Sequence, residues 1–466
     1  MPRLVSSLLA LSLLCACTPK TQIRGTGAAD RLIDLQALAG SRPGDPIREE
    51  VAGRSIERYE GFTLGIIELS DDGHVKDEVQ KEQVFDMVRQ VAGEKGAIIL
   101  TFVHGWHHGA GVCDSNVACF RNVLQGISDD PDRLNKGPVI GIYLGWRGDS
   151  SRKLQGATFY NRKRAAHRIG ENGGSTLLLE LAALEDELNA DLDQRRSPGF
   201  VTMVTAGHSF GGALVFSAVD KALVGEWGGR DGVGPLADTA GVNAGIKKQR
   251  RELGDLVLLI NPAFEADRYR LFDQDLALPG RYAPQCPVLV TVASQGDAAV
   301  GTAFPIGRFL WLLWHPWRWG HFSTELTGMG HYSPQWTHEL AYDGPPDTGE
   351  EKPGGCGCPF PSPAEIRKIR LAFTESQKAL PSSPAEPCAA LRALDSNGLK
   401  GVLPDGIRLT EIRPGWDKSS PYLVLHANAN LIPDHNDIYN KNFVKFLTAY
   451  LNLYLQEKPD ETPVPP

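Results

Sequence analysis

The sequence predicts an α/β fold in which helices flank a mostly parallel central sheet. Two observations indicate this class. Short apolar runs alternate with longer segments of helical periodicity along most of the chain, and the apolar runs show no polar alternation. Strands of that kind are buried on both faces, which requires helices on both sides of the sheet. At 466 residues, of which 42% are hydrophobic, the chain is long enough for one large domain of this class with insertions, or for two or three smaller domains.

The predicted strands and helices follow one another along the chain. The strands cover residues 62–69, 97–103, 139–144, 200–206, 256–260, 288–293 and 422–426. The helical patterns cover residues 79–91, 117–127, 159–169, 177–188 and 211–223, and a last amphipathic helix contains Phe443, Phe446, Leu447 and Leu451. Because helix-length segments separate most strands, successive strands are expected to run parallel.

One long segment interrupts this alternation. Residues 301–404 are crowded with Pro, Gly and Trp, and they predict an insertion that forms a lid over the site. Its tryptophan-rich stretch at 309–319 would pack on the core, line an acyl-binding wall or touch lipid. The core is then expected at 58–300 and 405–456, followed by a flexible tail at 457–466.

The N-terminus has the features of a targeting segment. Met1-Pro-Arg3 carries positive charge, residues 4–14 are apolar but too few to span a bilayer, and Leu14-Cys-Ala-Cys17 has the small residues of a cleavage site. One interpretation is a plain secretory signal with an incidental cysteine. The segment also resembles the lipobox of a bacterial lipoprotein.

That resemblance implies a signal peptide at 1–16 and a lipid anchor on Cys17. Thr18 stands where an Asp commonly retains such proteins in the inner membrane, so an outer-membrane location facing the periplasm is expected. Residues 17–57, rich in Gly, Arg, Asp and Pro with weak periodicity, are interpreted as a flexible tether that follows the lipidated cysteine.

An envelope location is oxidising, so the other cysteines are expected to form disulfides. Cys113 and Cys119 close a short loop and are predicted to pair with each other. Three pairings remain open for the other four cysteines, which are Cys286, Cys356, Cys358 and Cys388. A zinc site at Cys356-Gly-Cys358 is the alternative to a disulfide there.

A serine between two glycines stands where an apolar strand gives way to a helix. The run Val201-Thr-Met-Val-Thr-Ala-Gly207 is apolar and β-branched, and Ser209 and Gly211 follow at the start of a helical pattern. This is the context of a nucleophile elbow, a sharp turn that exposes a serine hydroxyl. Glycine on either side leaves room for the turn. We therefore expect Ser209 to be a nucleophile.

A nucleophilic serine needs a general base and a third group that orients the base. In a parallel sheet both are expected on loops after later strands, in the chain order Ser, acid, His. Asp297 follows the strand at 288–293 and is predicted to be the acid. His435 follows the strand at 422–426 and is predicted to be the base, a role that suits its near-neutral intrinsic pKa.

Other residues compete for these two roles. The alternative acids follow the preceding strand and are Asp267, Asp273 and Asp275. Asp437 is interpreted as a cap of the last helix. His426 lies inside a strand pattern, where a packed core histidine is expected. Three further histidines lie in the predicted lid, and they are His315, His321 and His331.

Two backbone N–H groups are predicted to form an oxyanion hole. Phe210, directly after the serine, would supply one of them at the positive end of the elbow helix. The other is expected from Trp106, which follows an early strand and Gly105. His104 is interpreted as a brace for this loop. A metal site is not expected, because the adjacent His107 and His108 diverge in most backbones and no carboxylate cluster accompanies them.

These segments resemble the α/β-hydrolase superfamily in its esterase and lipase branch. The resemblance covers about 62–297 and 407–455, and its carriers are Phe102-Val-His-Gly-Trp106, Ile140-Gly-Ile-Tyr-Leu-Gly-Trp-Arg147, Gly207-His-Ser-Phe-Gly-Gly212, Ser294-Gln-Gly-Asp297 and His435-Asn-Asp-Ile438. It implies the α/β-hydrolase fold and the same roles for the five residues named above. The chain departs from the pattern by lacking a His-Gly-Gly-Gly run and by a long insertion between acid and histidine.

The sequence thus predicts a membrane-anchored serine hydrolase that cleaves carboxylic esters, small or lipid-like, through an acyl-enzyme and without a cofactor. The same triad would also serve an amidase, a peptidase or an acyltransferase. A different class, an envelope lipoprotein that only binds, would keep the fold without the chemistry. A net charge of −8 and the absence of a basic stripe argue against nucleic acid as a partner. The sequence leaves the oligomeric state open.

Overall fold

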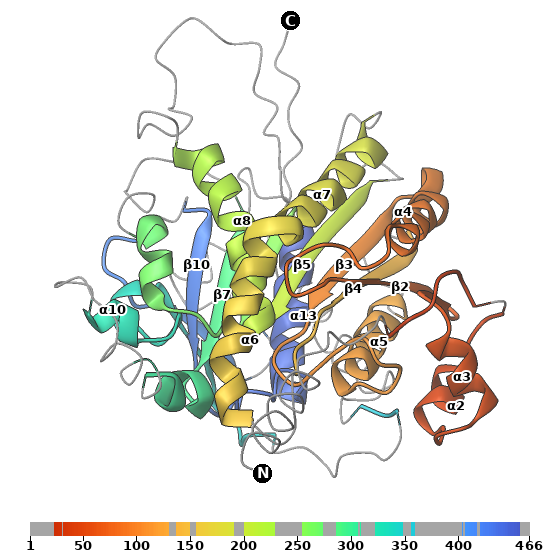
Figure 1. The fold of residues 1–466 in the computed structure, drawn as a ribbon. Coiled ribbons are helices and arrows are strands. Elements are labelled where there is room, and N and C mark those ends of the chain that lie inside the picture. Colours follow the sequence, from red (N-terminus) through yellow and green to blue (C-terminus); the bar gives the residue numbers. More distant parts are fainter. Residues whose placement is uncertain are drawn as a thin grey trace, which may run out of the picture.

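The structure of the chain, a computed structural model, describes residues 23–29, 31–129, 137–149, 155–190, 200–228, 254–273, 286–305, 308, 322–347, 356–358, 403, 406–416 and 420–456. Within them helices and strands alternate through most of the chain (Figure 1). The alternating elements are β2 (Phe62–Glu68), α4 (Glu78–Ala92), β3 (Ala97–Val103), α5 (Ser115–Ser128), β4 (Val139–Gly145), α6 (Gln155–Ile169), α7 (Ser175–Asn189), β5 (Val201–His208), α8 (Phe210–Gly228), β6 (Leu256–Ile260), β7 (Leu289–Ser294), β10 (Tyr422–Ala427) and α13 (Lys441–Gln456).

A ten-stranded sheet lies at the centre, in the order β1-β2-β4-β3-β5-β6-β7-β10-β8-β9. Neighbours from β2 to β8 (His338–Tyr342) are parallel, whereas β1 (Ile56–Arg58) and β9 (Ile407–Glu411) join the two edges antiparallel. The inner strands β3 and β4 are buried along their whole length. The predicted class, a mostly parallel sheet flanked by helices, is confirmed.

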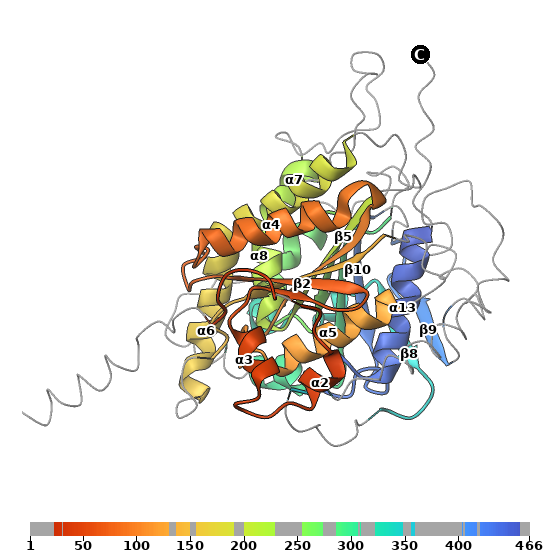
Figure 2. The same cartoon turned by 90° about the vertical axis from the view of Figure 1, so that its right-hand side faces the viewer.

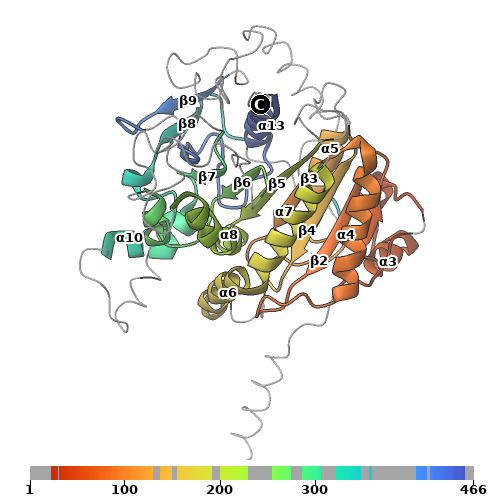
Figure 3. The ribbon, with the colours of Figure 1, turned by 90° about the horizontal axis from the view of Figure 1, so that it is seen from above.

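Helices cover both faces of this sheet (Figures 2 and 3). The apolar side chains of α4, α6, α7 and α8 pack with strand residues in one cluster, which includes Val84 and Leu214. Those of α5 and α13 pack on the other face, through Phe120 and Phe446. Because the neighbouring strands from β2 to β8 run parallel, the loops that follow them lie at a single edge of the sheet. None of the described helices is long and apolar enough to cross a membrane.

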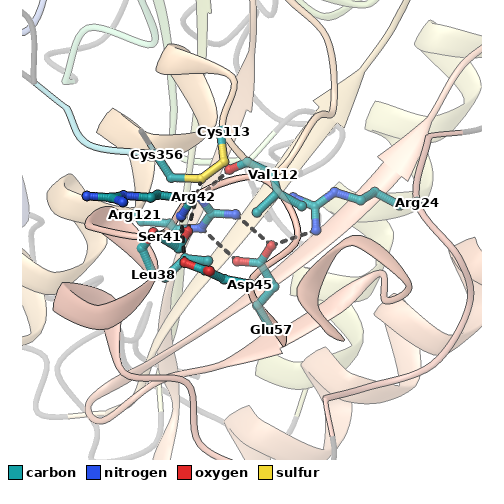
Figure 4. Close-up of a disulfide and its surroundings, with 10 residues drawn as sticks. All are labelled: Arg24, Leu38, Ser41, Arg42, Asp45, Glu57, Val112, Cys113, Arg121 and Cys356. Carbon is teal, nitrogen blue, oxygen red and sulfur yellow. Dashed lines mark hydrogen bonds and ion pairs between the residues drawn. A yellow bond between two sulfur atoms is a disulfide. The ribbon is translucent and has the colours of Figure 1, made fainter. Parts of the chain in front are cut away.

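The N-terminal part of the described chain packs on the domain, so the predicted tether at 17–57 is wrong from residue 23 onward. Arg24 Nη1 lies 2.9 Å from Glu57 Oε1, with both side chains fully buried, and Arg121 binds the same carboxylate through two bonds of 2.8 Å (Figure 4). Burial opposes ionisation of Glu57, but Arg121 and Arg24 outweigh it and lower its pKa to about 2. The composition of this segment predicts a flexible tether, whereas the fold buries Arg24 and pairs it with Glu57, the carboxylate that also binds Arg121.

Short elements accompany this buried ion cluster. They are α2 (Leu35–Ala39), α3 (Pro46–Ala52) and β1. Leu38 and Val51 from the two helices are buried against the sheet, which anchors the segment. The predicted signal peptide at 1–16, Cys17 and the tail at 457–466 lie outside the described residues.

Part of the predicted lid instead extends the sheet. β8 pairs in parallel with β10, and β9 pairs antiparallel with β8. The run His-Glu-Leu-Ala-Tyr of β8 is short and mixed in polarity, because a strand near the edge of a sheet needs less apolar surface than a central one. The tryptophan-rich stretch at 309–319 lies outside the described residues.

The predicted Cys113–Cys119 disulfide is not formed. Cys113 bonds to Cys356, 243 residues away, and Cys119 bonds to Cys358, 239 residues away (Figure 4 shows the first bond). Cys119 lies inside α5, whereas Cys113 precedes the helix and its N-cap Asp114, and each of the two cysteines bonds to a different residue of the Cys356-Gly-Cys358 run. The Cys-Gly-Cys run is thus shared between two disulfides. Cys286 is disulfide-bonded as well, and Cys388 lies outside the described residues.

The start of the last helix differs from the sequence interpretation. Asn440 caps α13, because its Oδ1 accepts hydrogen bonds from the N–H groups of Asn442 and Phe443 at 2.9 and 3.0 Å. Asp437 lies in the turn before this cap, where its N–H donates to the Asp434 carbonyl. The interpretation of Asp437 as the cap is therefore wrong.

Candidate active site

Ser209 lies on a tight turn between β5 and α8. Its φ of +56° is in the left-handed region, a conformation that costs energy for a residue with a side chain. A Cβ on Gly207 would lie 2.6 Å from the Gly211 carbonyl oxygen, and a Cβ on Gly211 would lie 2.1 Å from the Val103 carbonyl oxygen. Only glycine fits on either side of the serine, so this is the turn geometry that the sequence predicted.

The structure brings the three predicted triad residues together. His435 Nε2 lies 2.8 Å from Ser209 Oγ, and His435 Nδ1 lies 2.7 Å from Asp297 Oδ2. Asp297 is fully buried, and its second carboxylate oxygen accepts the Val300 N–H at 2.9 Å. A carboxylate can only accept, so the imidazole carries its proton on Nδ1 and leaves Nε2 free to accept the serine proton.

These side chains come from three separate strands of the sheet. Ser209 follows β5, Asp297 lies three residues after β7, and His435 lies on the loop after β10. β7 and β10 are neighbours, and β6 separates them from β5. Residues far apart in the chain therefore meet at the carboxyl edge of the sheet.

The alternative residues lie elsewhere or have other contacts. Asp267 accepts a hydrogen bond from Thr324 Oγ1 at 2.9 Å, and Asp273 pairs with Arg413. His426 is stacked on Trp336, with ring centroids 3.7 Å apart, as expected for a packed strand histidine. Three of the alternatives, Asp275, His315 and His321, lie outside the described residues.

The loop after β3 lies directly against the serine. A Cβ on Gly105 would come within 2.7 Å of Ser209 Cβ, so glycine is required for this approach. The Trp106 and Phe210 N–H groups, predicted as oxyanion donors, donate no hydrogen bond to any described residue. Both residues line the cavity that contains Ser209. The arrangement leaves both donors available to a substrate.

His104 holds this loop in place. Its Nδ1 donates to the Gly105 carbonyl at 2.9 Å, and its Nε2 accepts the Trp146 N–H at 3.0 Å. The ring is stacked between Tyr143 and Trp146, each 5.5 Å away between centroids. Burial lowers the pKa of His104 to about 4, so the ring stays neutral and keeps both hydrogen bonds.

A cavity of about 490 Å³ opens beside the serine. Aromatic rings form one wall, in which Phe159 contacts Trp106 edge-on at 5.3 Å and Phe210 at 5.0 Å between centroids. The lining residues are Trp106, His107, Phe159, Tyr160, Ser209, Phe210, Ala263, Ala299, Val300, Phe304, Asp434, His435 and Asn436. Most of the wall is apolar, so it suits an uncharged group.

Sequence reasoning missed two residues beside the triad, His208 and Asn261. Both donate hydrogen bonds to the backbone carbonyl of His435. For His208, the sequence signal was its position next to Ser209. For Asn261, it was only the position directly after a strand, because the His435 carbonyl that accepts its hydrogen bond lies 174 residues further along the chain.

Comparison with known proteins gives little sequence similarity. No protein-family model matches the chain, and no curated protein matches it. A solved structure of an acetylxylan esterase is similar at 14% sequence identity and a TM-score of 0.18, over 41% of this chain and 70% of the other.

Proposed function

We propose that this protein is a serine hydrolase that cleaves carboxylic esters through an acyl-enzyme. The observation that carries the proposal is the continuous contact from Ser209 Oγ through the His435 ring to Asp297. The buried carboxylate orients the ring and stabilises its charged form, which is what an activated serine needs. The strand order and the chain order Ser, Asp, His support placement in the α/β-hydrolase superfamily.

In the proposed mechanism, Ser209 Oγ attacks the ester carbonyl carbon while His435 Nε2 takes the hydroxyl proton. The negative charge on the carbonyl oxygen is stabilised by the N–H groups of Trp106 and Phe210. His435 then gives its proton to the leaving alcohol, which departs and leaves an acyl-serine. A water molecule repeats the same steps, and the acid is released with Ser209 restored.

A labelling experiment tests this proposal. A fluorophosphonate probe should modify the wild-type protein and fail to modify Ser209→Ala. Ser217→Ala is the matched control, because Ser217 is a buried serine of α8 that is hydrogen-bonded to His167. Absence of labelling in wild type, or equal labelling of Ser209→Ala, would refute the hydrolase function and favour a binding module.

Substrate profiling then separates the reaction classes. We expect turnover of p-nitrophenyl esters to exceed that of matched anilides and peptides, with a preference for uncharged acyl groups because the cavity wall is apolar. Asp297→Asn should lower kcat by about 10⁴-fold, since an amide favours the wrong histidine tautomer. Asp267→Asn is its control. Faster turnover of amides than of esters would contradict the esterase proposal and would indicate an amidase.

We also propose that a lipid on Cys17 anchors the protein to the bacterial outer membrane, facing the periplasm. The support is the lipobox-like run Leu14-Cys-Ala-Cys17 and the Thr that follows it. In a bacterial host, wild type should incorporate labelled palmitate and fractionate with outer membranes. Cys17→Ser should lose both properties, while Cys15→Ser should keep them.

A further inference from the structure

The backbone carbonyl of His435 accepts two side-chain hydrogen bonds. His208 Nε2 lies 2.9 Å from this oxygen, and Asn261 Nδ2 lies 3.1 Å from it. His208 precedes Ser209 in the chain, and Asn261 is the first residue after β6. The loop that carries His435 is thus held from beside the serine and from the strand between the serine and the acid.

His208 is a neutral donor with a single tautomer. It is fully buried, and burial, together with the nearby His435 ring, holds its pKa well below the usual range. The carbonyl acceptor requires the proton on Nε2, and the buried Nδ1 has no hydrogen-bond partner among the described residues. The neutral His208 ring lies 5.0 Å from the His435 ring between centroids.

Asn261 joins the same carbonyl to the strand that leads to Asp297. Its Oδ1 accepts the Ser294 N–H at 2.9 Å, and its own N–H donates to the Val292 carbonyl at 2.8 Å. Its φ is +43°, a conformation that Asn and Asp tolerate better than other side chains. Ser294 in turn donates through Oγ to Ile432 on the His435 loop at 2.5 Å.

We propose that His208 and Asn261 are positioning residues that fix the His435 ring between Ser209 and Asp297. This inference rests on the proposed hydrolase function. The two side chains donate hydrogen bonds to the His435 backbone carbonyl rather than to its ring. They therefore determine the position of the base but do not take a proton from the serine. A displacement of the base by about 1 Å can lower the rate about 10²-fold.

Matched variants separate positioning from simple stability. His208→Leu removes the donor, whereas His208→Gln keeps an N–H near the same position. Asn261→Asp keeps the oxygen that accepts the Ser294 N–H and tolerates the positive φ, but it replaces the donor with a carboxylate oxygen. For each variant, the burst of p-nitrophenol released from p-nitrophenyl acetate is measured, and thermal unfolding measures its stability.

The burst amplitude counts functional sites, and the burst rate reports acylation in those sites. We expect His208→Leu and Asn261→Asp to acylate about 10- to 100-fold more slowly with little change in KM. His208→Gln should recover most of the rate even where its melting temperature is lowered. Wild-type burst rates in His208→Leu and Asn261→Asp, or equal slowing in His208→Gln and His208→Leu, would overturn the positioning role.

Failure of this inference is distinct from failure of the proposed function. The hydrolase fails if wild type shows no fluorophosphonate labelling that depends on Ser209. The positioning role fails if that labelling is present and the donor-lacking variants are labelled at the wild-type rate.

Discussion

Gly105 and Ser209 lie so close that a single methyl group on the glycine would displace one of them. A Cβ on Gly105 would be 2.7 Å from Ser209 Cβ and 3.1 Å from the His208 carbonyl oxygen, both part of the turn that carries the nucleophile. The loop with one proposed oxyanion donor and the turn with the proposed nucleophile therefore form one packed unit.

Gly105→Ala is expected to lower kcat/KM for ester hydrolysis by about 10²-fold, because the shift moves Trp106 relative to Ser209. Gly109→Ala is the control on the same loop, since its Cβ would meet only Ile23 Cδ1 at an ordinary 3.5 Å. Steady-state kinetics on p-nitrophenyl acetate measure both variants. Equal activity of the two would contradict the close packing.

Loss of the Glu57 charge is expected to destabilise the protein by about 3–5 kcal/mol, because Glu57→Gln leaves two buried guanidinium groups without a counter-ion. Arg24→Met should cost less, since the Glu57–Arg121 pair stays neutral. Glu50→Gln, which breaks an exposed pair with Arg31, should change stability by less than about 0.5 kcal/mol. Urea unfolding measures all three, and similar losses at Glu57 and Glu50 would show that the cluster is not buried.

The free energy of unfolding is expected to decrease at acidic pH because the buried His104 ring becomes protonated. The unfolded chain binds a proton there below pH 6.5, while the folded protein stays neutral down to about pH 4. The contribution of the neutral ring to the free energy of unfolding is therefore complete above pH 6.5 and is lost as the pH falls toward 4. The total loss is about 3 kcal/mol. Other buried histidines act in the same direction, so the measurement compares wild type with His104→Asn.

Urea unfolding of both proteins at several pH values between 7 and 4 gives this difference. The gap in stability between wild type and His104→Asn should narrow as the solution becomes more acidic. A gap that stays constant over the whole interval would mean that His104 does not stay neutral in the fold.

The Cys113–Cys356 and Cys119–Cys358 disulfides are expected to stabilise the protein non-additively. They enclose almost the same loop, of 243 and 239 residues, so once one is formed the other closes only a short ring. Removing one bond should cost about 2–3 kcal/mol, whereas removing both also frees the long loop and should cost more than twice as much. The variants are Cys358→Ser with Cys119→Ser, Cys356→Ser with Cys113→Ser, and all four together. Simple additivity in urea unfolding would contradict this arrangement.

The sequence alone predicted the strands that form most of the sheet and the residues that meet at its edge. These features depend on local patterns: an apolar run long enough for a buried strand, glycines around Ser209, and polar residues directly after strands. Because parallel strands end at one edge, the positions of Asp297 and His435 after β7 and β10 were sufficient to expect their meeting. β8 and β9 escaped prediction because edge strands have weaker apolar patterns.

Only the tertiary structure decided which distant residues become partners. Arg24 can be buried because Glu57, from another segment of the chain, pairs with both Arg24 and Arg121. The residues next to Arg24 in the sequence do not predict these contacts. Cys113 bonds to Cys356 rather than to nearby Cys119, which lies inside α5 and bonds to Cys358, because the fold brings the distant Cys-Gly-Cys run to both. The His435 carbonyl is held by His208 and Asn261 for the same kind of reason. Local sequence determines what each segment can form, but long-range contacts arise only when the packed sheet brings the segments together.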